Sequence, residues 1–238
     1  MLNRDDQGDY WWELRPCVYY KSFEEPKIIW GNLSTKSSFT YDSLNYYISA
    51  PACFIPTSDK WLLALLNSTV SSYFLRNTAI ERQGGFIEQK PMYVKEVPIP
   101  EISDKIKALL TSKVDSALQL HKEREVLAQQ SLEVLRTEYA IDKATQRLQN
   151  FLSLGWNEFI EELEKQHTLF TLQQKDELNK CFRKKQEDFR VLERKIKQID
   201  DSIDTEIYKL YRLNNTDIQV ILSTMQQKDP IHSLALAA

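Results

Sequence analysis

The chain has 238 residues, of which 42% are hydrophobic and 27% are charged, and its formal net charge at pH 7 is −3. A chain of this length can bury a core, in one large domain or in two small ones. The acidic balance excludes a positive field over the whole molecule, so a DNA-binding surface would have to be a local patch.

The cysteines and the apolar runs indicate the cellular compartment in which we expect the protein. The three cysteines, Cys17, Cys53 and Cys181, are odd in number and far apart, which suits neither a disulfide framework nor paired zinc ligands. The apolar run at residues 61–66 is far too short to cross a bilayer. We therefore expect a cytoplasmic protein with reduced thiols and no membrane partner.

The composition changes near residue 100. The first hundred residues hold seven of the eight prolines, four of the five glycines and 17 of the 26 aromatic residues. Proline and glycine mark turns, and aromatic or β-branched runs between them mark strands. We predict an α+β fold, with a mixed α/β domain at residues 1–100 and a helical region with antiparallel long helices at residues 101–238.

In the first domain, four short aromatic or β-branched runs precede turn signals and are predicted to be strands. These runs are Val18–Tyr20, Lys27–Trp30, Phe39–Tyr41 and Tyr46–Ile55. Ser58 is a suitable N-cap for a following helix, whose apolar residues recur at three- and four-residue spacing and which ends near Arg76 or Asn77. We expect this helix to pack on the sheet.

A polar loop follows that helix. Residues 81–86 contain two adjacent glycines, which suit an exposed loop whose backbone comes close to a partner. Pro98 and Pro100 disfavour a helix before them, so the next helix is expected to begin after Pro100, with Ser103 as its cap. The predicted domain boundary lies there.

The region after Pro100 is predicted to form long amphipathic helices. One seven-residue series predicts a long helix, either continuous or broken, and consists of Leu120, Leu127, Val134, Ile141 and Leu148. A second series predicts another and consists of Phe182, Phe189, Ile196, Ile203 and Leu210. These two helices are expected to form an antiparallel hairpin. A short final helix is expected after a capping box formed by Thr216 and Gln219.

Motifs for methyl transfer are absent from the sequence. The chain has no Asp or Asn followed by Pro-Pro and an aromatic residue, and no P-loop, GxGxxG turn or GxSxG elbow. A metal-dependent nuclease is one alternative, because Glu88 and Lys90 have a Glu-x-Lys spacing. An exposed loop end beside Pro91 explains so short a motif more simply, and we predict no catalytic, cofactor or metal residues in this chain.

Several motifs occur in an order that is similar to one known family. They are Trp11–Arg15, Lys27–Trp30, Leu62–Ser68, Arg82–Phe86 and Val97–Pro100. Residues 10–125 resemble the TaqI-like C-terminal specificity domain of adenine-specific DNA methyltransferases and type IIG restriction-modification enzymes. Residues 201–218 resemble the tail that such large enzymes carry after their specificity domain.

The resemblance implies that this chain selects the target site on double-stranded DNA. It also implies an accompanying methyltransferase domain, in the same chain or in a separate one, which would bind S-adenosylmethionine. The base-reading residues differ between members of the family, so none can be carried over. A second alternative, supported by the acidic pI and the seven-residue repeats, is a helical scaffold that binds another protein.

Physical reasoning selects candidate base contacts. Arginine can pair with guanine, and glutamine with adenine, through two hydrogen bonds each. The polar loop supplies both residue types beside a permissive backbone, so Arg82, Gln83 and Gly84 are predicted to contact bases. A solvated loop accounts for these residues equally well.

Two further segments are predicted to contact phosphates, which position a protein without specifying sequence. The polar loop at Thr35, Lys36 and Ser37 offers hydroxyls, amides and an ammonium group. Residues 180–197 contain eight basic and three acidic residues, and Lys184 and Lys185 are adjacent within this stretch. An ordinary hairpin loop and a solvated helix face are the alternatives for these two segments.

Overall fold

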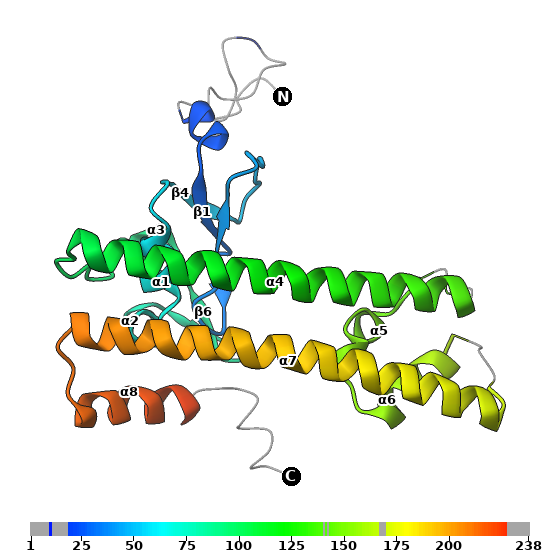
Figure 1. Ribbon diagram of the computed structural model, residues 1–238. Coiled ribbons are helices and arrows are strands. Elements are labelled where there is room, and N and C mark those ends of the chain that lie inside the picture. The colour runs from blue at the N-terminus through cyan, green and yellow to red at the C-terminus, as the bar shows by residue number, and fades with distance from the viewer. Residues whose placement is uncertain (1–9, 11–18, 140, 142, 167–169, 228–238) are drawn as a thin grey trace. The chain divides into compact units, whose positions relative to one another are not determined.

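The computed structural model describes residues 10, 19–139, 141, 143–166 and 170–227. Figure 1 shows small sheets and short helices in the first part of the chain and long helices in the second, which confirms the α+β fold. Val18 and the motif Trp11–Arg15 lie outside the described residues. Tyr20 begins a 3₁₀ helix, η1 (Tyr20–Glu24), so the prediction that Tyr20 belongs to a strand was wrong.

The first sheet has three antiparallel strands in the order β3-β1-β4. These strands are β1 (Lys27–Trp30), β3 (Phe39–Asp42) and β4 (Cys53–Pro56). β1 and β3 confirm the prediction. Only the end of the predicted strand Tyr46–Ile55 is a strand, because the Asp42 carboxylate accepts hydrogen bonds from the backbone N–H groups of Leu44 and Tyr46 and turns the chain there.

A second antiparallel sheet, which the sequence did not predict, has the order β2-β6-β5. Its strands are β2 (Leu33–Ser34), β5 (Glu81–Arg82) and β6 (Phe86–Glu88). β5 and β6 form a hairpin, and β2 pairs with the other edge of β6. The segment predicted to be a polar loop is therefore largely a hairpin.

The helix predicted to start after Ser58 is two helices, α1 (Lys60–Asn67) and α2 (Thr69–Thr78). Ser68 separates them, because its side chain accepts a hydrogen bond from the backbone N–H of Ser71 and caps α2. α1 packs against β3, as expected for a helix that covers the sheet. A short helix, α3 (Pro91–Val94), follows the second sheet.

The helical region contains two long helices, α4 (Asp104–Tyr139) and α7 (Leu172–Leu210). Within residues 112–203 they run antiparallel, which confirms the predicted hairpin (Figure 1). The Lys113 ammonium group donates to the Ser202 hydroxyl at 2.8 Å, and the Arg124 guanidinium lies over the Phe189 ring at 6.0 Å from its centre. α4 starts directly after Ser103, where its cap was predicted.

The first predicted long helix is broken before it reaches Leu148, so of the two alternatives the continuous helix was wrong. α4 ends at Tyr139, and Leu148 belongs to another short helix, α5 (Gln146–Gln149). Val134 of the seven-residue series is 60% exposed, whereas Ser131 and Leu135 are buried. A straight helix has 3.6 residues per turn, so a strict seven-residue series drifts away from its buried face.

A compact hydrophobic core packs between the C-terminal end of α4 and the N-terminal end of α7. In the chain, α4 and α7 are connected through α5, the 3₁₀ helix η2 (Phe151–Ser153) and α6 (Trp156–Glu164). Buried leucine, isoleucine and phenylalanine side chains from these elements pack with α4 and α7. The rings of Phe159 and Phe182 stack with their centres 4.7 Å apart.

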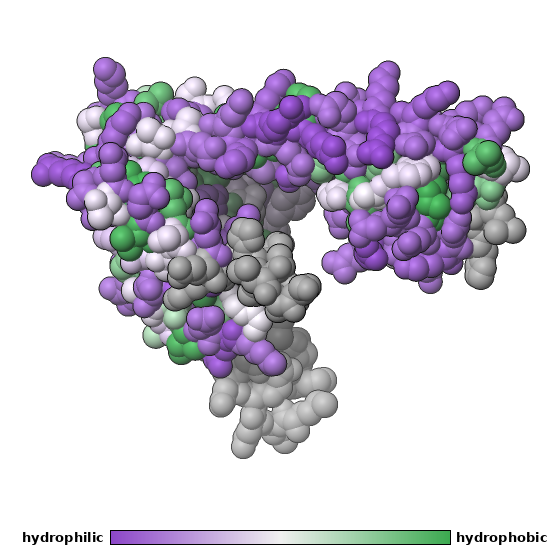
Figure 2. Space-filling view, turned by 90° about the horizontal axis from the view of Figure 1, so that it is seen from below, coloured by the Kyte–Doolittle hydropathy of each residue, from purple (hydrophilic) through white to green (hydrophobic). Residues whose placement is uncertain are grey.

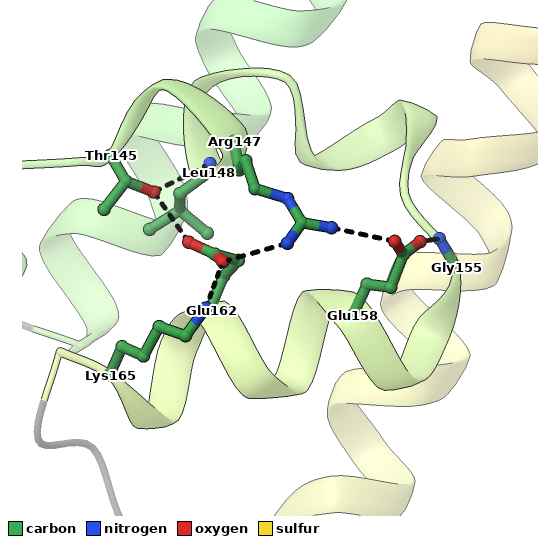
Figure 3. A network of polar contacts seen from close by, with 7 residues as sticks. All are labelled: Thr145, Arg147, Leu148, Gly155, Glu158, Glu162 and Lys165. Carbon is green, nitrogen blue, oxygen red and sulfur yellow. Dashed lines mark hydrogen bonds and ion pairs between the residues drawn. The ribbon is translucent and has the colours of Figure 1, made fainter. Parts of the chain in front are cut away.

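A polar network fixes the turn between α5 and α6 (Figure 3). The buried Glu162 carboxylate accepts hydrogen bonds from the Thr145 hydroxyl at 2.9 Å and the Lys165 ammonium at 2.6 Å. Arg147 lies 3.5 Å from Glu162 and 2.8 Å from Glu158. The bonds from Lys165 and Thr145 lower the pKa of Glu162, which is therefore ionised at neutral pH.

The chain divides into two compact units, residues 1–111 with 204–238 and residues 112–203. This division differs from the boundary expected near residue 100, because the chain returns to the first unit at Asp204. The Asp204 carboxylate accepts hydrogen bonds from the Thr69 backbone N–H at 2.8 Å and the Thr69 hydroxyl at 2.5 Å, at the start of α2. A sequence-based boundary misses a contact between residues so far apart.

The last helix, α8 (Asn215–Gln227), packs against α2. Its cap is Asn214 rather than the predicted Thr216. The Asn214 side chain accepts from the backbone N–H groups of Thr216 and Asp217, and Asp217 accepts from the Asn214 N–H in return. None of the helices in the described part of the chain is long and apolar enough to cross a membrane.

Candidate nucleic-acid interface

The predicted base contacts lie at the tip of the β5–β6 hairpin. Arg82 is paired with Phe86 across the hairpin, and residues 83–85 form the turn between them. Gly84 and Gly85 have φ angles of 80° and 74°. Glycine adopts this left-handed conformation without strain, so the two glycines allow a tight, exposed tip on which Gln83 and Gly84 are open to solvent.

The strand register places the first predicted phosphate loop beside that tip. β2 pairs antiparallel with β6, with Ser34 opposite Ile87. The chain that follows Ser34 therefore leaves the sheet at the end where the hairpin turns. The structure thus brings Thr35 and Lys36 to the same end of the sheet as Arg82.

Hydrogen bonds from two side chains hold the backbone of this loop. The Thr35 carbonyl accepts a hydrogen bond from Arg76, and the Lys36 carbonyl accepts one from the Gln89 side-chain amide at 2.9 Å. The Lys36 side chain is exposed, whereas Ser37 is buried. A phosphate cannot reach the Ser37 hydroxyl in this conformation, so Thr35 and Lys36 are the residues of the loop that are open to a ligand.

Arg82 forms an ion pair that the sequence did not suggest. Its Nε donates to the Glu88 Oε1 at 2.8 Å, and its Nη2 donates to the same oxygen. The Lys90 ammonium lies 2.8 Å from the other carboxylate oxygen. The Glu88 side chain is 6% exposed, compared with 55% for Arg82 and 42% for Lys90. The hydrogen bonds from Lys90 and Arg82 hold the pKa of Glu88 below its usual value.

The sequence contains a signal that could have revealed this pair. The register sets Arg82 opposite Phe86, and Glu88 lies two residues further along β6. Alternate residues of a strand share one face, so the three side chains lie on the same face of the sheet. Recognition of the glycine pair as a hairpin turn would have placed Glu88 within reach of Arg82.

Lys184 and Lys185 lie on α7 within residues 112–203, the second unit. Both side chains are exposed, and within the described chain neither forms an ion pair. By contrast, Arg194 pairs with Glu187 at 2.6 Å and Lys197 with Asp201 at 3.1 Å. Figure 2 shows a mainly hydrophilic surface along the long helices. The two lysines are thus free to bind an anion.

The Glu-x-Lys segment is not the exposed loop end that we expected. Glu88 is the last residue of β6, and Gln89 is buried, with its carbonyl accepting a hydrogen bond from the Trp30 indole at 2.6 Å. Among the residues that the structure describes, no group of three His, Cys, Asp or Glu side chains is arranged to hold a metal ion.

Comparison with known families divides the chain into two matched segments. Residues 5–99 match the family model of the TaqI-like C-terminal specificity domain, which confirms the resemblance to that family as far as residue 99 but not its expected extent to residue 125. Residues 103–207 match a domain of unknown function (DUF8810). No curated protein matches the chain. The first match supports a DNA specificity domain of a methyltransferase or restriction-modification enzyme.

Proposed function

We propose, from the similarity of residues 5–99 to the TaqI-like C-terminal specificity domain, that this chain is the target-recognition part of an adenine-N6 DNA methyltransferase or type IIG restriction-modification enzyme. The family match is the observation that carries the proposal. In this account the chain binds double-stranded DNA and selects the site. A methyltransferase domain, in the same chain or in a separate one, binds S-adenosylmethionine and transfers the methyl group.

The hairpin tip carries side chains whose chemistry is suitable for reading bases. The major groove of B-form DNA admits a two-stranded β-ribbon, and base edges there present distinct patterns of donors and acceptors. The β5–β6 hairpin belongs to a three-stranded sheet, but the pair of Arg82 with Phe86 lies beyond the last residue pair of β2 with β6, and the exposed tip carries Arg82 and Gln83. Its neighbour Lys36 lies at the same end of the sheet and supplies a cation for a phosphate.

The second unit carries a separate candidate contact with the DNA backbone, on α7. Exposed lysines add affinity that does not depend on sequence, because each phosphate contact releases a counterion from the DNA. Lys184 and Lys185 fit this role, since they are exposed and neither forms an ion pair with another of the residues that the structure describes. The net charge of the whole chain is −3, so DNA binding depends on such local groups.

The experiment that tests the proposal is selection from a duplex library with randomised sequence, using the purified chain at low salt. We expect the bound fraction to become enriched in one short motif. Addition of a separately produced methyltransferase domain should tighten binding, because such enzymes flip the target base out of the helix towards the catalytic site. Absence of any enriched motif, with and without that domain, would contradict the proposal.

A further inference from the structure

The ion pair at the hairpin tip leaves one edge of the Arg82 guanidinium open. An arginine side chain has five N–H donors in a planar fork. The Nε–H and one Nη2–H are directed at Glu88 Oε1, and no partner holds Nη1 among the described residues. The end of the fork, with one N–H from each terminal nitrogen, remains available. A guanine base presents two acceptors, O6 and N7, to such a pair of donors.

We propose that Arg82 reads a guanine in the target sequence with this open end and that Glu88 is the positioning residue that aims it. The inference rests on the proposed function, because it requires duplex DNA in contact with the hairpin. It specifies what the site recognises: the selected motif contains a guanine whose recognition depends on Arg82. Glu88 acts only through Arg82 and does not touch the base.

The burial of Glu88 makes it an effective anchor. A long arginine side chain loses rotamer freedom when it binds, and a partner that fixes it beforehand reduces that loss. The Glu88 carboxylate is 6% exposed and lies in the middle strand of its sheet, with Leu33 opposite on β2. Its position is therefore set by the sheet rather than by solvent.

Lys90 completes the arrangement. A carboxylate close to the bases would repel DNA, but this one lies between two cations, Arg82 and Lys90. The three groups together carry one positive charge. Their sum therefore attracts the duplex, while the paired hydrogen bonds to Glu88 still direct the arginine fork.

The test repeats the library selection with variants of the full chain. Arg82→Lys keeps the charge but removes the fork, and it should reduce discrimination at a single guanine by about fivefold or more, since a bidentate pair discriminates about 5- to 150-fold. Glu88→Gln should weaken discrimination at the same guanine and leave affinity for mixed-sequence duplex unchanged or higher. Glu96→Gln, an exposed control with the same chemical change, should leave the motif intact.

The outcomes separate this inference from the proposed function. If the unaltered chain selects a motif and Arg82→Lys changes no guanine position in it, the inference is wrong and the proposed function stands. A selection that yields no motif overturns both. Should Glu88→Gln melt below the assay temperature, Glu88→Asp retains the carboxylate with a shorter reach. It should then show an intermediate loss at the same guanine, and an unchanged motif from a folded Glu88→Asp would remove Glu88 from the positioning role.

Discussion

Replacing Lys184 and Lys185 by glutamine tests whether α7 contacts the DNA backbone. Both side chains are exposed, and neither has an ion pair among the described residues, so the substitution removes two charges and breaks no ion pair within that part of the chain. The folded state should be unaffected, because exposed substitutions away from caps and cores usually change stability little. Only the ionic part of DNA binding should respond.

The size of the effect follows from counterion release. Each phosphate contact contributes about 0.9 to the slope of log binding constant against log salt concentration, so two contacts contribute about 1.8. Between about 50 and about 200 mM salt, this difference corresponds to about a 12-fold change in relative affinity. Over this range of salt concentration, the affinity of the unaltered chain for DNA should fall by a factor about 12 times larger than that of the double variant.

The assay is fluorescence anisotropy with a mixed-sequence duplex over a series of salt concentrations. The matched control is the double variant Arg194→Gln and Lys197→Gln, which removes two charges of the same helix that already pair with Glu187 and Asp201. We expect a smaller change of slope in this control. An identical slope for the Lys184/Lys185 variant and the unaltered chain would refute the contact, and equal changes in both variants would indicate an unspecific charge effect.

Two further predictions concern the second unit. Glu162→Gln should lower the melting temperature at pH 7. The folded-state pKa of Glu162 lies below the ordinary 4.5, so its ionised form stabilises the fold above that pH and this contribution disappears as the pH falls through the lower value. Melting curves from neutral to acidic pH should therefore converge for the two proteins, and a constant difference would contradict the argument. Phe182→Ala removes a ring that is 2% exposed and should cost about 3–5 kcal/mol in urea unfolding, whereas a loss below about 1 kcal/mol would show that the core does not depend on it.

The sequence correctly predicted those elements that are determined by residues close together in the chain. The strand at Lys27–Trp30 is a short β-branched and aromatic run before a glycine, and the structure has β1 there. The start of α4 at Asp104 follows from the two prolines and Ser103. For these elements the residues that determine the structure are neighbours in the chain.

The buried charges could not be predicted in this way. Lys27 is fully buried, and its ammonium group lies 2.6 Å from the Asp42 carboxylate on the neighbouring strand. Burial alone opposes ionisation of Asp42, but the hydrogen bonds from Lys27 and from two backbone N–H groups lower its pKa. Only the pairing of β1 with β3 brings these two groups together, and a single lysine in an apolar run gives no sign of it.

The candidate site was predicted in part for the same reason. The polar, glycine-containing segment was recognised as exposed, and the structure does place Gln83 and Gly84 at an exposed tip. The ion pair of Arg82 with Glu88 depends on the strand register and was missed. The base and phosphate contacts themselves remain predictions, because they require the DNA.

The most direct test of DNA recognition through the hairpin compares library selection by the unaltered chain with selection by a variant in which Arg82 and Gln83 are both alanine. Thermal melting of both proteins first shows that the variant is folded. We predict one enriched motif for the unaltered chain, and a weaker or shorter motif for the variant. The same motif at the same enrichment from both proteins would contradict recognition through the hairpin.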